Sequence, residues 1–146
     1  MNQEHCFKTA FGKEELLPFH RYYFEIRCLR GNNFKIGIAT AKAKENPNSA
    51  FCDTEAGYGY FSTGSLRHAS KGTGFPYGEK YKQDDVIGVY VDLVDGVIFF
   101  SKNGVVMERN AFVGDKLLRD GQTFFPAACC LSKNEMFELI EPSAED

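Results

Sequence analysis

The sequence contains no tryptophan and only three histidines, which lie far apart at His5, His20 and His68. No two histidines stand four residues apart, and no pair of cysteines has the C-x-x-C spacing of a zinc site. Neither a G-x-S-x-G nucleophile motif nor a glycine-rich phosphate-binding motif occurs. We therefore expect no metal, no cofactor and no catalytic residue, and we classify the chain as non-enzymatic.

Long apolar segments are also absent. No run approaches the roughly 20 residues of a membrane-spanning helix, and the N-terminal residues lack the apolar core of a signal peptide. The five cysteines are odd in number, include the adjacent pair Cys129-Cys130, and occur without an N-glycosylation sequon. These absences favour a reduced intracellular protein, cytoplasmic or nuclear, over a secreted disulfide framework.

The charge balance is slightly acidic, with a net charge of −3 and a sequence pI of about 5.6. Nonspecific affinity for nucleic acid depends on clustered lysine and arginine side chains. One short basic stretch, Arg67-His68 with Lys71, is typical of a solvated loop edge. We therefore expect no direct binding of nucleic acid by this chain.

What the sequence does contain is a series of short strand patterns separated by glycine-containing turns. Arg21–Leu29 and Phe34–Thr40 are rich in aromatic and β-branched residues and predict a hairpin. Further strands are predicted at 58–62, 66–70, 86–93, 97–102, 124–131 and 136–141, and no segment has the period of a long helix. The pattern predicts a single all-β domain, either a sandwich or a barrel.

Two dipeptides, Asp95-Gly96 and Asn103-Gly104, flank the predicted strand Val97–Lys102. Both are typical of two-residue type I′ hairpin turns, in which each central residue has a positive φ. We expect Ile98 and Phe100 of this strand to point into the core, because alternate residues share one face.

Three longer segments separate the strands. The segment Ala41–Gly57 has little periodicity and exceeds the usual length of a connection, so it is a candidate functional loop. The segment 71–84 is rich in glycine, and the polar segment 108–122 is expected to hold one helical turn. We divide the chain into a lead-in strand or linker at 1–19, a domain at 20–141 and an acidic tail at 142–146.

With these strands in order, the chain resembles a SPRY domain. Six pieces follow the order of that family: YYFEI (22–26), FKIGIAT (34–40), YGYFSTGS (58–65), YGEKYKQDDVIGVYVDL (77–93), GVIFFSKNG (96–104) and FFPAACC (124–130). The pattern is most similar to the SPRY domains of heterogeneous nuclear ribonucleoprotein U, a DEAD-box RNA helicase and the Ash2-type methyltransferase subunit.

The resemblance implies a bent β-sandwich of two antiparallel sheets, related to the concanavalin-like folds. It also implies a monomeric, non-enzymatic module within a larger intracellular protein, which binds a peptide or a partner protein through loops on one side. Carried over to this sequence, the partner-binding residues are Lys35, Pro47, Phe51, Tyr58, Tyr60, Phe61, Arg67 and Tyr77. We expect Lys35, Tyr58 and Tyr60 to be exposed or nearly so.

The chain departs from the family pattern in two ways. Many SPRY domains carry tryptophan in the strand that here reads FKIGIAT, so a tryptophan-based pocket is excluded. The strands before YYFE are also short. Two other interpretations stay open: a lectin-like sandwich that binds carbohydrate, and a module associated with RNA processing.

Overall fold

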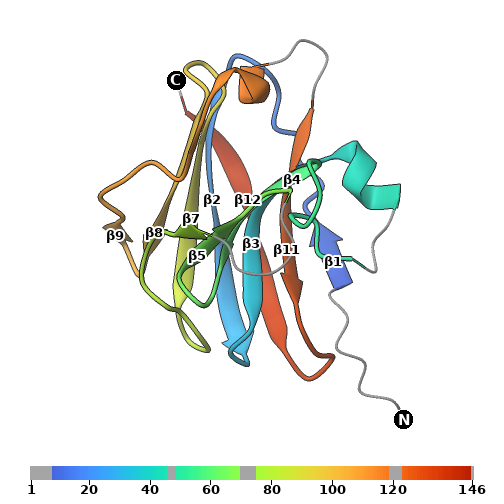
Figure 1. Ribbon diagram of the computed structural model, residues 1–146, viewed down its shortest axis with the longest axis vertical. Helices are drawn as coiled ribbons and strands as arrows, with labels where there is room; N and C mark the ends of the chain where they lie inside the picture. Colours follow the sequence, from blue (N-terminus) through green and yellow to red (C-terminus); the bar gives the residue numbers. More distant parts are fainter. Residues whose placement is uncertain (1–7, 46–48, 70–74, 119–122, 146) are drawn as a thin grey trace.

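The computed structural model describes residues 8–45, 49–69, 75–118 and 123–145. These residues form two antiparallel sheets packed face to face (Figure 1), together with two short 3₁₀ helices, η1 (Ala41–Glu45) and η2 (Asp115–Leu118). The predicted all-β sandwich is confirmed. Within the described residues, no helix is long and apolar enough to cross a membrane.

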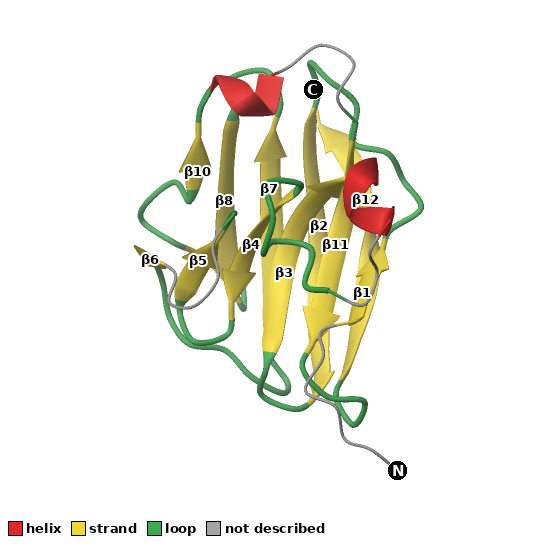
Figure 2. Cartoon of the chain, turned by 45° about the vertical axis from the view of Figure 1, so that its right-hand side comes forward, coloured by secondary structure: helices red, strands yellow, loops and turns green. Residues whose placement is uncertain are grey.

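Each sheet has six strands (Figure 2). In sheet B five strands follow one another as neighbours, and the sixth, short strand pairs with one of these five. Sheet A runs in the order β1 (Lys8–Phe11), β11 (Phe124–Cys130), β3 (Phe34–Thr40), β4 (Gly57–Phe61), β5 (Ser65–Arg67) and β6 (Phe75–Pro76). Sheet B runs in the order β10 (Phe112–Val113), β8 (Val97–Lys102), β7 (Val86–Asp92), β2 (Arg21–Arg30) and β12 (Met136–Glu145), and β9 (Val105–Val106) pairs with β8.

The main core lies between the two sheets. Every second residue of the long strands points into it, as the alternation in the sequence predicts. Ile98 and Phe100 are fully buried there, which confirms their predicted direction. Tyr81 closes one part of this core, where the backbone carbonyls of Tyr60 and Phe34 share the single O–H donor of its hydroxyl.

The two predicted hairpin turns have different outcomes. At Asn103-Gly104 both residues have positive φ, 51° and 86°, and the flanking residues Lys102 and Val105 pair directly, as a two-residue type I′ turn requires. At Asp95-Gly96 the prediction is wrong. Asp92 pairs with Val97, so the loop has four residues, and only Gly96 has a positive φ.

The strand boundaries differ from the prediction mainly at the ends of the chain. β12 continues to Glu145 by pairing with β2, so residues 142–145 are part of the sheet, where the sequence predicted a frayed acidic tail. The lead-in segment contributes β1, which pairs with β11. The short strands β6 and β10 lacked any detectable sequence pattern.

Candidate functional site

The outer face of sheet A is covered by the loop of residues 49–56, which we name the cap loop. Ala50, Phe51 and Cys52 of this loop are buried against residues of β3 and β11, and form a second, smaller hydrophobic cluster. The sheet is therefore packed on both faces at this place. This explains why β3 is buried at almost every position, whereas a strand with one solvated face alternates.

Glycines in β4 allow the cap loop to approach the sheet. A Cβ atom at Gly59 would lie 2.9 Å from the sulfur of Cys52, and one at Gly57 would lie 2.2 Å from the backbone oxygen of Phe51. Only a residue without a side chain fits at such distances. The cap loop is thus seated on a rigid sheet, which is a suitable support for a binding surface.

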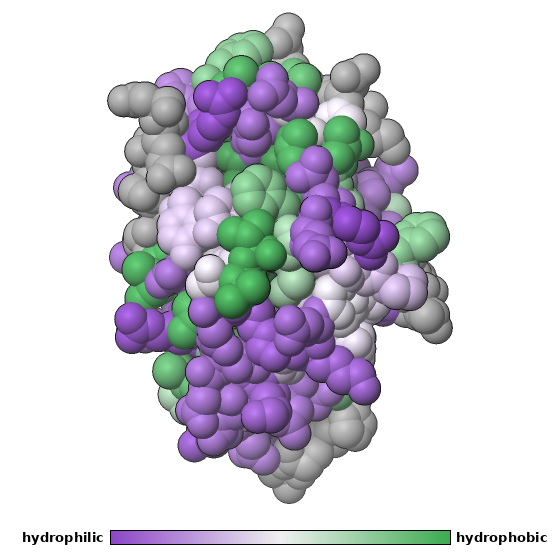
Figure 3. All heavy atoms as spheres, turned by 90° about the vertical axis from the view of Figure 1, so that its left-hand side faces the viewer, coloured by the Kyte–Doolittle hydropathy of each residue, from purple (hydrophilic) through white to green (hydrophobic). Residues whose placement is uncertain are grey.

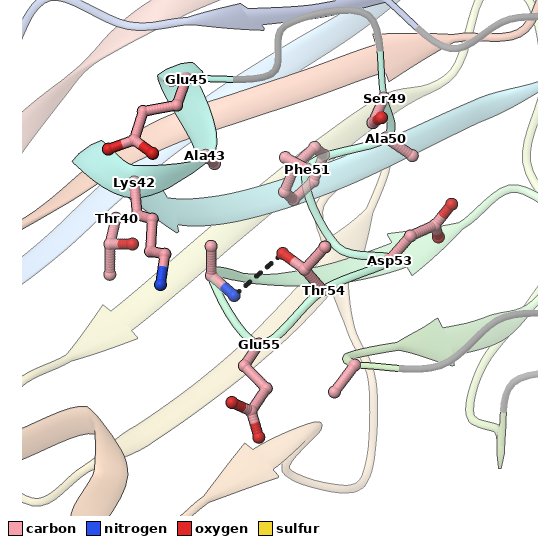
Figure 4. Close-up of a pocket in the computed structure, with 12 residues that line it drawn as sticks. Thr40, Lys42, Ala43, Glu45, Ser49, Ala50, Phe51, Asp53, Thr54 and Glu55 are labelled. Carbon is pink, nitrogen blue, oxygen red and sulfur yellow. Dashed lines mark hydrogen bonds between the residues drawn. The ribbon is translucent and has the colours of Figure 1, made fainter.

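A pocket of about 690 Å³ lies between the cap loop and η1, and we name it the cap pocket. Figure 4 shows Lys42 and Glu45 on the η1 side and Thr54 and Glu55 on the cap-loop side. The hydroxyl of Thr54 accepts a hydrogen bond from the backbone amide of Ala56 at 3.2 Å, which fixes the turn of the loop. The lining combines charged side chains of both signs with the apolar side chains of Ala50 and Phe51.

Beside the cap pocket, two cations of sheet A share one carboxylate of the cap loop. The Lys35 ammonium donates to Asp53 Oδ1 at 3.1 Å, and the Arg67 guanidinium lies 3.8 Å from the same oxygen. The ring of Phe61 packs beneath both cations, at 5.0 Å from Lys35 Nζ and 5.5 Å from the guanidinium carbon. We name these four residues the cation cluster.

The predicted exposure of Lys35, Tyr58 and Tyr60 is wrong, because all three are buried. Lys35 lies under the cap loop, as described. Tyr58 stacks on the ring of His68 with 4.0 Å between ring centres, and Tyr60 packs in the core with its hydroxyl donating to the backbone oxygen of Glu79. In this structure none of the three presents its side chain to a partner.

The other predicted site residues fall at different places. Phe51 is buried as the base of the cap pocket, Arg67 is buried and Phe61 is half-buried in the cation cluster. Tyr77 is half-buried at a second hollow, away from the cap loop. Pro47 lies outside the described residues.

That second hollow, of about 530 Å³, lies between β6 and the segment before β10. The hydroxyl of Tyr77 donates to the backbone oxygen of Arg109 at 2.8 Å, and the Arg109 guanidinium donates in return to the oxygens of Pro76 and Tyr77. Figure 3 shows hydrophobic residues gathered on the side of the molecule that carries β8, β9 and β10. Val105, Val113 and Phe75 are among the most exposed apolar residues described.

Two kinds of reactive site are relevant to the described residues, a metal site and a reactive thiol. Among them, no three His, Cys, Asp or Glu side chains group as metal ligands would. Cys28, Cys52, Cys129 and Cys130 are free thiols, and burial raises the pKa of Cys28 and Cys52 to about 12. A thiol with so high a pKa is protonated at neutral pH and is a poor nucleophile.

The sequence indicates the segment that forms the candidate pocket, but of the residues that line this pocket it indicates only Phe51. Ala41–Gly57 was identified as a candidate functional loop, and it contributes both η1 and the cap loop. Asp53, Lys42 and Glu55 carried no motif that would distinguish them from other loop charges. Their role follows from tertiary packing, which places them over sheet A.

A bent all-β sandwich with a loop packed over one sheet is an architecture that interaction domains use. Comparison with family models identifies the family. The model of the SPRY domain matches residues 21–143, most of the chain. The chain belongs to the SPRY domain family, whose members are protein-interaction modules and are generally non-enzymatic.

Relatives at the sequence level are Ran-binding proteins. The chain is 34% identical over 84 residues to Ran-binding protein 9 of Homo sapiens and of Xenopus laevis, and to Ran-binding protein 10 of Danio rerio. The alignments cover 57% of this chain but only 12–15% of those proteins. The finer resemblance to ribonucleoprotein U, the helicase and the Ash2-type subunit stays a prediction.

A solved structure confirms the fold. The SPRY domain of human HERC1 superimposes with a TM-score of 0.71, covering 94% of this chain and 84% of that chain, at 17% sequence identity. At this identity the match shows the architecture alone.

Proposed function

We propose that this chain is a non-enzymatic protein-binding module, part of a larger intracellular protein, and that it holds a peptide or partner segment in the cap pocket. The observation that carries this proposal is the cap pocket itself. It joins exposed charges of both signs to the ring of Phe51, on a loop that β3 and β4 hold in place. An apolar base with a polar rim is the usual composition of a protein interface.

Of the residues that the family resemblance indicates, Phe51 contributes directly to this pocket. Phe61 and Arg67 contribute through the cation cluster beside it. Tyr77 belongs to the second hollow and is a contact only for a partner that spans both. The four free thiols among the described residues support the proposed intracellular setting. We expect the module to be monomeric.

The test is an affinity pull-down from a eukaryotic lysate with quantitative mass spectrometry. The pocket variant combines Lys42→Glu and Glu55→Lys, which reverses two exposed charges and keeps the net charge. The matched control combines Arg27→Glu and Glu138→Lys, which does the same to an exposed pair on the outer face of sheet B, 3.9 Å apart. Both variants are first shown to fold by circular dichroism.

A partner retained by the wild type and the control but lost by the pocket variant supports the proposal. A partner lost only by the control would move the site to sheet B. A partner retained by both variants, or binding only of glycans on an array, would overturn the cap pocket as the site.

A further inference from the structure

The cation cluster has a hydrogen-bond donor with no acceptor. The Arg67 side chain is 8% exposed, and its Nε–H makes no hydrogen bond to any residue that the structure describes. Its terminal nitrogen lies 3.8 Å from Asp53 Oδ1, which is too far for a hydrogen bond. A buried charged group with unmet donors destabilises a fold, so it needs a reason to be there.

The carboxylate of Asp53 is the group that the two cations hold, and it is the least buried member of the three. Its side chain is 24% exposed, whereas that of Lys35 is 1% exposed. Figure 4 shows Asp53 in the cap loop at the edge of the cap pocket, with its carboxylate pointing away from Thr54 and Glu55. Because Asp53 is the most exposed of the three side chains, an incoming group would reach the two cations by replacing this one side chain.

From these contacts we infer that Lys35 and Arg67 form a binding site for a carboxylate, which a partner's Asp or Glu side chain occupies when the Asp53 side chain moves out. The inference rests on the proposed function, because Asp53 is part of the wall of the cap pocket. In the free protein, the carboxylate of Asp53 occupies this site, and the proposed ligand carries the same chemical group.

A carboxylate fits the site better than a phosphate does. Asp53 shows that one planar group with one negative charge is accommodated between the two cations. Exchange for another carboxylate leaves the charge of the site unchanged, whereas a phosphomonoester brings a charge of about −1.5 to −2 and a tetrahedral shape. The planar ring of Phe61 closes one side, and Arg67 offers Nε–H and a terminal N–H in the parallel arrangement that binds both oxygens of a carboxylate.

The direct test observes Arg67 Nε–H in the wild-type protein by ¹H–¹⁵N NMR during titration with sodium acetate. The signal is assigned by its loss in Arg67→Lys. We expect it to shift saturably with acetate and not with sodium chloride at the same ionic strength or with neutral acetamide. An unchanged signal, or a response to chloride as large as to acetate, would overturn the inference. A response to inorganic phosphate alone would overturn the carboxylate assignment.

A second test uses Asp53→Ala, which vacates the position of the carboxylate. We expect acetate at about ten times its dissociation constant to raise the melting temperature of this variant by about 3–6 °C over equal chloride. Glu138→Ala, an exposed change on sheet B, is the control, and we expect it to gain much less because acetate must displace Asp53 there. The double variant Asp53→Ala/Arg67→Gln loses the acetate effect. An equal gain in the double variant would contradict the site.

The experiments distinguish a failure of the carboxylate site from a failure of the cap pocket. If acetate leaves Arg67 Nε–H unchanged while the pocket variant still loses its partner, the carboxylate site is wrong and the cap pocket stands. If acetate binds but the pocket variant keeps every partner, the cap pocket is wrong and the carboxylate site stands.

Discussion

The carboxylate of Glu135 accepts a hydrogen bond from the backbone amide of Asn33 at 2.9 Å, across 102 positions of sequence. The same oxygen accepts a hydrogen bond from the backbone amide of Asn32. The second oxygen accepts hydrogen bonds from the backbone amides of Leu131 and Ser132, at 3.0 and 3.1 Å. One side chain thus joins the turn between β2 and β3 to the turn between β11 and β12. It connects the two sheets at one end of the sandwich.

Replacing Glu135 with Ala is expected to lower the free energy of unfolding by about 2–3 kcal/mol, because four backbone donors lose a charged acceptor. The measurement is urea denaturation followed by fluorescence or circular dichroism. The control is Glu138→Ala on the neighbouring strand, where an exposed ion pair is worth at most about 0.5 kcal/mol. Equal losses in the two variants would show that Glu135 does not connect the turns in solution.

The glycine at position 37 has no room for a side chain. A Cβ atom there would lie 1.8 Å from the backbone oxygen of Tyr58, in the middle of the pairing between β3 and β4. We expect Gly37→Ala to destabilise the domain by more than about 3 kcal/mol and to reduce its soluble yield.

The matched control is Gly104→Ala, where the added atom meets none of the described residues within 4 Å and only the φ of 86° opposes it. That strain costs about 1 kcal/mol. Thermal melting compares the two variants directly. If Gly37→Ala melted within a degree of Gly104→Ala, β3 and β4 would have to be further apart than described.

The buried hydroxyl of Tyr81 satisfies backbone oxygens inside the core. Burial, as the largest cause, raises the pKa of Tyr81 well above its ordinary value, so the hydroxyl stays a donor at all working pH values. Tyr81→Phe removes the one donor that the buried oxygens of Phe34 and Tyr60 share, so we expect a loss of about 1–3 kcal/mol.

Tyr22→Phe is the comparison for this variant, since its hydroxyl accepts one bond from the exposed amide of Leu17 at 3.0 Å. We expect a loss below about 1 kcal/mol there, because water replaces the partner. Denaturation midpoints of the Tyr81→Phe and Tyr22→Phe variants, each compared with the wild type, provide the measurement. A Tyr81→Phe variant as stable as the wild type would remove the proposed role of the hydroxyl.

Stability is expected to fall in acid because of carboxylates at the ends of β7. Burial acts to raise the pKa of Asp92, but hydrogen bonds from the amides of Asp95 and Val94 and from Arg21 outweigh it and hold the pKa below 3.8. Asp85 has a lowered pKa for similar reasons. A lowered folded-state pKa gives stability that is complete above the unfolded value and is lost as pH falls through the folded value.

We therefore expect the free energy of unfolding to decline from about pH 4 downward, and Asp92→Asn to flatten that decline while lowering stability at pH 7. Melting curves at half-unit steps from pH 7 to pH 2 provide the measurement. Glu55→Gln, an exposed change on the cap loop, serves as control and should follow the wild type. A wild-type curve that stays level to pH 2 would contradict the assigned hydrogen bonds.

Much of the sandwich followed from local rules of the sequence. The alternation of Val86–Asp92 and the bounds of Val97–Lys102 depend on side chains that face a single core, and the Asn103-Gly104 turn depends on two neighbouring residues. The error at Asp95-Gly96 has a local cause as well. The carboxylate of Asp92 binds the amides of the following residues and favours a wider loop.

The candidate site could be predicted only in part, since its burial comes from segments distant in sequence. Lys35 occupies the outer face of β3, where alternation alone predicts contact with solvent. The cap loop then covers that face and brings Asp53 to the lysine. Tyr58 is buried for a different reason, because it faces the main core and packs against Phe112 and His68. The periodicity of one strand holds no information about a loop that packs on it later.

The strand order has a consequence for how this domain acquires its structure during synthesis. Among the described strands, β1 pairs only with β11, and one edge of β2 pairs with β12. Early and late parts of the chain are therefore neighbours in both sheets. A nascent chain that ends before residue 124 has its first strands exposed, with no partner to pair with on those edges. Because these pairings join residues far apart in the sequence, we expect the domain to fold slowly and to complete both sheets only after its last two strands have left the ribosome.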